Sequence, residues 1–134
     1  MKYKFLEHTA DVKFQAFGSS LKSVFENSAL ALRETMFGKI KISEDIKKKF
    51  EVEADDNPGL LYRFLEQFLY LLDAENFIFN RVIIKIKNNR LYAEVWGDLA
   101  SNYKFTNDVK AITYNQMRVE KNGRKFMTQV VLDV

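Results

Sequence analysis

The sequence predicts an α+β fold, a two-layer sandwich in which a largely antiparallel sheet carries two helices packed on one face. Three observations lead to this expectation. Two segments place apolar residues at helical spacing, several others alternate apolar and polar residues, and short turns join consecutive strand candidates. Such hairpin connections produce antiparallel neighbours, because parallel strands need long crossover connections.

Both helix candidates begin and end at residues that suit helix ends. The first spans about Leu21–Phe37, with a serine before it as the cap and Gly38 after it as the stop. The second spans about 58–73 and begins at a proline, with Asn57 as its expected cap. Its broad apolar stripe predicts that it packs on a sheet.

Strand candidates fill most of the remaining chain. They lie at 2–6, 12–17, 50–53, 77–87, 90–96, 109–120 and 125–134. Asn88-Asn89 and Asn122-Gly123 are two-residue turns typical of hairpins. Residues 45–49 fit either a turn or a short helical piece.

Composition limits the classes of protein that the chain can belong to. Its 134 residues are 47% hydrophobic and 29% charged, with no cysteine and one histidine, His8. A chain of this length buries about two-thirds of its surface, so we expect one domain over residues 1–134 that needs no stabilising disulfide or metal. The absence of cysteine excludes thiol nucleophiles, iron–sulfur clusters and thiolate zinc sites.

The charge balance is mildly basic, with 21 Lys and Arg against 18 Asp and Glu, a net charge of +3. This balance allows a partner that contains RNA but does not require one. The run Lys47-Lys48-Lys49 has acidic neighbours and is typical of a solvated surface. We find neither a signal peptide nor an apolar segment long enough to span a bilayer, so we expect no membrane contact, and the absence of cysteine fits a cytoplasmic protein.

Candidate chemistry lies near the two ends of the chain. Asp11 follows His8-Thr9-Ala10 between two strand candidates, where a plain turn is the alternative interpretation. Asp133 ends a β-branched strand, in which aspartate is unusual, and the terminal carboxylate of Val134 adds a second negative charge. A frayed, solvated end is the alternative there. If the first and last strands lie close together, these oxygens converge, and oxygen donors suit Ca²⁺ or Mg²⁺ rather than Zn²⁺.

Two other charged residues lie within or beside strand candidates. Lys110 belongs to the apolar segment 109–120, where it is either edge protection or a functional cation. Asp98 follows Trp96-Gly97 at a strand end and fits a turn as well as a ligand role. The five glycines are scattered, so none forms a phosphate-binding loop.

Ordered motifs over the whole length resemble the archease family. They are Phe5-Leu6-Glu7-His8-Thr9-Ala10-Asp11, Gly18 with Ser20-Leu21, Val24-Phe25-Glu26-Asn27, Leu60-Leu61, Phe68-Leu69-Tyr70-Leu71, Val109-Lys110-Ala111-Ile112-Thr113-Tyr114 and Leu132-Asp133-Val134. Each motif alone is weak evidence, but the ordered set is specific.

The resemblance implies a non-catalytic accessory protein of the RtcB-type RNA ligase in tRNA splicing, which promotes guanylylation and multiple turnover of the ligase. Its partner would be the ligase, with tRNA and guanine nucleotide met indirectly through it. The resemblance also implies a divalent-cation site at Asp11, Asp133 and Val134. Ca²⁺ is the expected ion, with Mg²⁺ or Mn²⁺ as alternatives. Lys110 matches the family's functionally important lysine.

His8 and Asp98 are further candidate site residues. The Gly-Glu motif of the family stands here as Gly97-Asp98, and Asn115 occupies a position where many members have histidine. A general chaperone or protein-binding module, a metal-dependent hydrolase and a direct RNA binder are the alternative functions. A chaperone predicts an exposed apolar patch, and an RNA binder predicts a continuous basic face.

Overall fold

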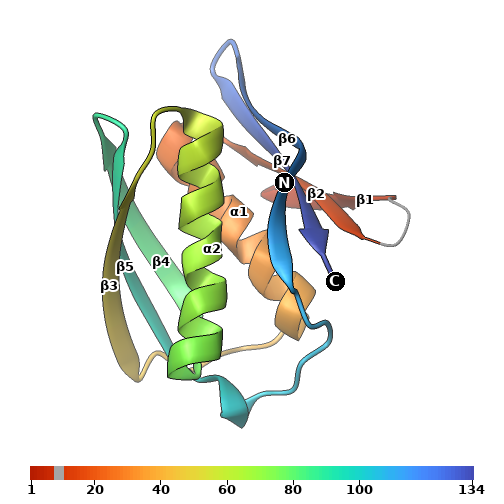
Figure 1. The fold of residues 1–134 in the computed structure, drawn as a ribbon, viewed down its shortest axis with the longest axis vertical. Coiled ribbons are helices and arrows are strands. Elements are labelled where there is room, and N and C mark those ends of the chain that lie inside the picture. The colour runs from red at the N-terminus through yellow and green to blue at the C-terminus, as the bar shows by residue number, and fades with distance from the viewer. Residues whose placement is uncertain (8–10) are drawn as a thin grey trace.

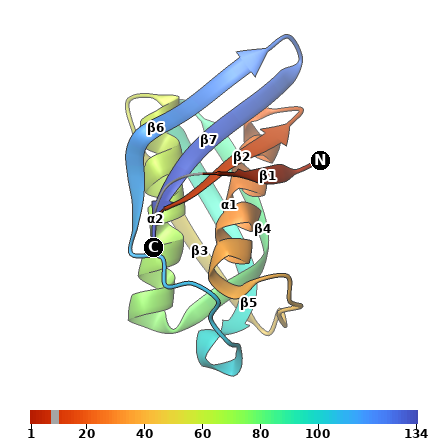
Figure 2. The same cartoon turned by 90° about the vertical axis from the view of Figure 1, so that its right-hand side faces the viewer.

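The computed structural model describes residues 1–7 and 11–134 and confirms the α+β class. Two helices lie between two antiparallel sheets and contact strands of both (Figures 1 and 2). The elements are β1 (Tyr3–Leu6), β2 (Val12–Gly18), α1 (Leu21–Phe37), β3 (Ile46–Glu53), α2 (Asn57–Glu75), β4 (Phe77–Lys87), β5 (Arg90–Leu99), a 3₁₀ turn (Ala100–Asn102), β6 (Ala111–Asn122) and β7 (Lys125–Asp133).

The strands divide between two sheets, whereas the sequence led us to expect one. The four-stranded sheet has the order β1-β2-β7-β6, and the three-stranded sheet has the order β3-β5-β4. Each predicted hairpin lies within one sheet, and Asn88 and Asn89 both have the positive φ that their turn requires. Segment 45–49, for which the sequence left a turn and a short helical piece as alternatives, is neither. Strand β3 begins at Ile46 and pairs with β5.

Helix α1 is capped at both ends by local hydrogen bonds. The Ser20 hydroxyl accepts from the backbone N–H of Ser23 at 3.0 Å, and the Ser23 hydroxyl accepts from the N–H of Ser20 at 3.1 Å. This reciprocal pair satisfies two donors that the first helical turn leaves free. At the other end Gly38 has φ +73° and donates its N–H to the Glu34 carbonyl at 2.7 Å. The observed limits of α1 match the predicted ones.

Helix α2 begins one residue earlier than expected. Asp56, rather than Asn57, is the cap, and its carboxylate accepts from the N–H of Gly59 at 2.8 Å. Pro58 lies in the first turn, where its missing N–H costs nothing. Asn76 ends the helix in the left-handed conformation, with φ 51°.

The core lies where the helices face the sheets. Phe64 and Phe68 of α2 contact each other edge to face at 5.1 Å, and Phe68 meets Phe79 of β4 at 4.5 Å. Burying each such ring stabilises the fold by about 1.5–3 kcal/mol. Helix α1 also covers one edge of the three-stranded sheet, because its Glu26 carboxylate accepts from the N–H of Ile84 at 3.1 Å.

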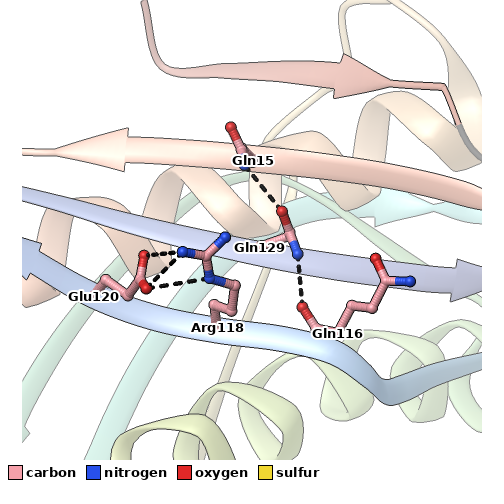
Figure 3. A network of polar contacts seen from close by, with 5 residues as sticks. All are labelled: Gln15, Gln116, Arg118, Glu120 and Gln129. Atoms are coloured by element: carbon pink, nitrogen blue, oxygen red, sulfur yellow. Dashed lines mark hydrogen bonds and ion pairs between the residues drawn. The ribbon is translucent and has the colours of Figure 1, made fainter.

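A polar network joins three strands of the four-stranded sheet (Figure 3). Strand β6 bulges between Thr113 and Arg118, where Gln116 has φ +59°. The amide of Gln129, which is buried in β7, accepts from Gln15 Nε2 at 2.9 Å and donates to the Gln116 carbonyl at 2.8 Å. One side chain therefore fixes the bulge to β7 and β7 to β2.

Replacing Gln129 with leucine should lower the free energy of unfolding by about 1–2 kcal/mol, because Gln15 and the Gln116 carbonyl each lose a part-buried hydrogen bond. Gln116→Ala is the matched control. Gln129 bonds the main chain of Gln116 and not its side chain, so this variant should change stability by no more than about 0.5 kcal/mol. Urea denaturation measures both, and equal losses would contradict the assigned role of Gln129.

Candidate functional site

Three strand ends meet at one end of the four-stranded sheet. Val12, at the start of β2, pairs with Leu132 of β7, and Ala111, at the start of β6, pairs with Asp133. Asp11 directly precedes β2, and Lys110 directly precedes β6. The topology therefore places the predicted residues Asp11, Asp133, Val134 and Lys110 at the same end of this sheet. The first and last segments of the chain are close, as the sequence-based hypothesis required.

A backbone hydrogen bond fixes Lys110 to the end of β7. The N–H of Lys110 donates to the Asp133 carbonyl at 2.7 Å. Leu132 and Ile112 are buried in the core immediately beside these residues, whereas the side chains of Asp133 and Lys110 are exposed. The charged groups are therefore carried by a rigid base and remain accessible to a ligand or partner.

The segment before Lys110 is held by the end of α1. Thr106 Oγ1 and Asn107 Nδ2 both donate to the Thr35 carbonyl at 2.9 Å, and the N–H of Thr106 donates to the Met36 carbonyl at 2.7 Å. The last carbonyls of a helix have no partner within the helix, so this segment supplies the missing donors. These bonds direct the chain from the helix end into Lys110 and β6.

An open pocket of about 870 Å³ lies beside Asp11. Its lining residues are Phe5, Leu6, Glu7, Asp11, Val12, Glu34, Thr35 and Asn107. The Tyr3 hydroxyl donates to Glu34 at 2.8 Å, and burial together with this bond raises the pKa of Tyr3 to about 12. Tyr3 therefore stays a neutral donor at physiological pH. No local pattern in the sequence indicates Glu34 and Asn107, because α1 and the segment before β6 bring them here.

The side chains of the described residues do not by themselves form a metal site. Within residues 1–7 and 11–134, no group of three or more His, Cys, Asp or Glu side chains is placed to hold a metal ion. A site built on Asp11 and Asp133 would therefore take a further oxygen from the main chain or terminus at Val134. His8 lies outside the described residues. In the described part of the chain, no helix is long and apolar enough to cross a membrane.

Comparisons with known proteins place the chain in a family. The profile of the Archease protein family matches residues 3–134. The chain belongs to the archease family. It is 39% identical to the archease of Pyrobaculum neutrophilum, over 98% of this chain and 95% of that protein. It is 36% identical to the archease of Pyrococcus abyssi, with 99% of each chain covered.

Two solved structures have the same fold as this archease chain. Protein 1598 of Methanobacterium thermoautotrophicum, determined in solution, superimposes with a TM-score of 0.82 at 28% identity and covers 99% of each chain. The crystal structure of an archease from Thermotoga maritima has a TM-score of 0.70 at 22% identity, covering 98% of this chain and 96% of that one. The second likeness concerns the fold alone.

The Gly97-Asp98 pair of this archease lies on β5, in the other sheet from Asp11 and Asp133. A Cβ at Gly97 would lie 1.9 Å from the Ile78 carbonyl oxygen, so the close approach of β4 requires glycine there. Asp98 accepts from the Tyr103 hydroxyl at 2.9 Å. Bonds to Asp98 from the Leu99 backbone, the Tyr103 hydroxyl and the Asn102 amide hold its pKa below its usual range. This geometry gives both residues a structural role at the 3₁₀ turn.

The lowered pKa of Asp98 predicts an acid-dependent loss of stability. A carboxyl whose pKa is lower in the folded state stabilises the protein above its unfolded pKa of about 3.9, and this contribution is lost as the pH falls through the folded pKa. Asp98→Asn should therefore remove part of the decrease in unfolding free energy below about pH 4. Urea titrations of the parent and the variant at several pH values measure this. Asp73→Asn, on the exposed face of α2, is the charge-matched control.

Proposed function

We propose that this archease is a non-catalytic, metal-binding activator of an RtcB-type RNA ligase in tRNA splicing, which promotes guanylylation and multiple turnover of the ligase. The observation that carries the proposal is the convergence of Asp11, Asp133, Val134 and Lys110 at one end of the four-stranded sheet, in a chain of the archease family. The same end has an open pocket large enough to admit a partner's side chains.

The donor set at this end fits a hard divalent cation. Two aspartates and a main-chain or terminal oxygen at Val134 supply oxygen donors only, which suit Ca²⁺ and, with fewer protein ligands, Mg²⁺ or Mn²⁺. A bound cation would supply positive charge next to the phosphates of the ligase's nucleotide. Asp11 and Asp133 would orient that charge from a base that the β2–β7 pairing keeps rigid.

Lys110 would contribute a second positive charge from the protein itself. Its backbone is fixed by the bond to Asp133, while its side chain is exposed at this end of the sheet. Phosphoryl transfer is accelerated chiefly by positioning and by positive charge near the phosphate oxygens. A lysine presented in this way would assist guanylylation inside the ligase site, so the archease would need no complete active site of its own.

The chaperone alternative finds less support in the distribution of apolar side chains. The exposed ones, among them Phe5, Tyr92, Phe105 and Tyr114, are distributed over β1, β5, the segment before β6 and β6 itself. Ligation assays with the cognate ligase separate the two functions. An activator should convert single turnover into multiple turnover at substoichiometric amounts, whereas a chaperone should raise only the fraction of active ligase. If the archease alone turned over GTP or RNA, both the activator and the chaperone function would be rejected in favour of a hydrolase.

Asp11→Asn and Asp133→Asn should each abolish the rise in melting temperature that Ca²⁺ gives the parent, because a ligand stabilises only a protein that binds it. Both variants should also fail to support multiple turnover by the ligase. Differential scanning fluorimetry with and without Ca²⁺ measures the first effect and gel-based ligation the second. Asp73→Asn removes the same charge from α2 and should behave as the parent. If Ca²⁺ still raised the melting temperature of both variants, the proposal of a metal site at this end of the sheet would be wrong.

Lys110→Ala should uncouple metal binding from activation. The side chain is exposed, so the free energy of unfolding should change by no more than about 0.5 kcal/mol, and the Ca²⁺-dependent stabilisation should persist. Ligase guanylylation should nevertheless fall by at least about tenfold, because the variant lacks one positive charge at the phosphates. Lys85→Ala, on the three-stranded sheet, is the matched control and should activate normally. If the Lys110→Ala variant activated the ligase fully, Lys110 would not be a functional cation and would serve only to protect the edge strand β6.

A further inference from the structure

A groove of about 810 Å³ lies at the far end of the four-stranded sheet from the candidate metal site. It is bounded by the segment before β1, the end of β2, the start of α1 and the β6–β7 hairpin, which extends beyond both helices (Figure 1). Strand β7 runs about 26 Å between the two ends, at a rise of ~3.3 Å per residue. The groove therefore shares no residue with the site described above.

The floor of this hairpin groove is apolar and well anchored. Phe17 pairs with Met127 across β2 and β7, so their half-buried side chains share one face of the sheet, whereas the neighbouring Phe126 points to the other face and packs against the core. The backbone of Phe17 is fixed from two sides, because its N–H donates to the Lys2 carbonyl at 2.8 Å and its carbonyl accepts from Asn27 Nδ2 at 2.7 Å. A preformed floor of this kind lowers the entropy cost of binding.

The rim of the groove is positively charged. Lys2, Arg124 and Lys125 line it and are exposed, and none of the acidic residues that the structure describes lines it with them. Within the described part of the chain, these three cations form no ion pair. An apolar floor with an unneutralised cationic rim is complementary to an amphipathic segment whose polar face is acidic.

The aromatic contacts favour a peptide over a single-stranded nucleic acid. Base stacking requires open aromatic faces. Here Lys4 lies over the Phe17 ring at 5.8 Å and Lys121 over the Phe126 ring at 5.5 Å, and both phenylalanine side chains are half-buried, so little open ring surface remains for a base. Met127 adds a flexible, polarisable side chain of the kind that accommodates aliphatic partners in peptide-binding grooves.

We propose that the hairpin groove binds an acidic amphipathic helix of a partner protein. The apolar side chains on one face of that helix, at positions i, i+3 or i+4 and i+7, pack on Phe17 and Met127, which share one face of the sheet. Its Asp and Glu residues face Lys2, Arg124 and Lys125. This binding depends neither on a metal ion nor on the proposed ligase role of the opposite end.

The test uses the full-length protein and a fluorescein-labelled helical peptide of about 18 residues, with leucines on one face and glutamates elsewhere. Fluorescence anisotropy should show saturable binding. Arg124→Glu combined with Lys125→Glu should weaken it by at least about tenfold, and Met127→Gln by at least about threefold. Lys87→Glu, at the tip of the β4–β5 hairpin, is the control and should change affinity by less than about twofold. Amide chemical shifts confirm that each variant is folded.

Two control peptides separate groove binding from simple charge attraction. A peptide with serine in place of every leucine should lose binding by at least about tenfold, and so should one with lysine in place of every glutamate. The inference is overturned if the leucine-free peptide binds as well as the parent peptide, or if no variant in the groove weakens binding. It is also overturned if an oligouridylate of about 12 nucleotides binds more tightly and Arg124→Glu with Lys125→Glu removes that binding.

Discussion

The antiparallel pairing of β2 with β7 joins the first and last parts of the chain along the centre of the four-stranded sheet. Every residue of the candidate metal site depends on it. Asp11 owes its position to the start of β2, and Asp133 owes its position to the end of β7. The same ladder continues to Gly18 and Phe126, which belong to the hairpin groove. Loss of this pairing would disperse both surfaces at once.

Strand β6 is attached to this central pair at separate points. Near the site, Ala111 pairs with Asp133, and the preceding segment bonds the carbonyls at the end of α1. Beyond the bulge, the buried amide of Gln129 holds the Gln116 carbonyl. The bulge lies between these attachments, so β6 changes direction without moving its first residues. The position of Lys110 is thus fixed by α1 and β7 together, and not by the hairpin that follows.

Local signals in the sequence were sufficient for the helices and the hairpin turns. The serine cap and Gly38 defined α1 correctly, and Asn88-Asn89 marked a turn because asparagine tolerates positive φ. The division into two sheets could not be predicted in this way. It depends on pairing between strands that are remote in sequence. The alternation of apolar and polar residues within a strand does not show which other strand will pair with it. The secondary structure of segment 45–49 could not be decided from the sequence for a related reason. Its residues from Ile46 onward form a strand because they pair with β5.

The candidate site was predictable only in part. An aspartate at the end of a β-branched strand is unusual, and this local anomaly pointed to Asp133. The proximity of Asp11 required the assumption that the chain ends meet, which the register of β2 and β7 supports. Glu34 and Asn107 carried no comparable signal, because they reach the pocket from α1 and from an irregular segment. In the sequence Asp98 fitted a turn as well as a ligand role, and its hydrogen bonds are those of the turn after β5.

The modest net charge of +3 conceals a strong separation of charge along β7. Three carboxylates, those of Glu7, Asp11 and Glu34, line the pocket at one end, whereas cations line the hairpin groove at the other. The two ends lie about 26 Å apart along the strand, and the Debye length at physiological ionic strength is about 8 Å. Each end therefore acts on its own surroundings with little influence from the other. One small fold in this way presents carboxylates at one end and cations at the other, a separation that the total charge alone does not reveal.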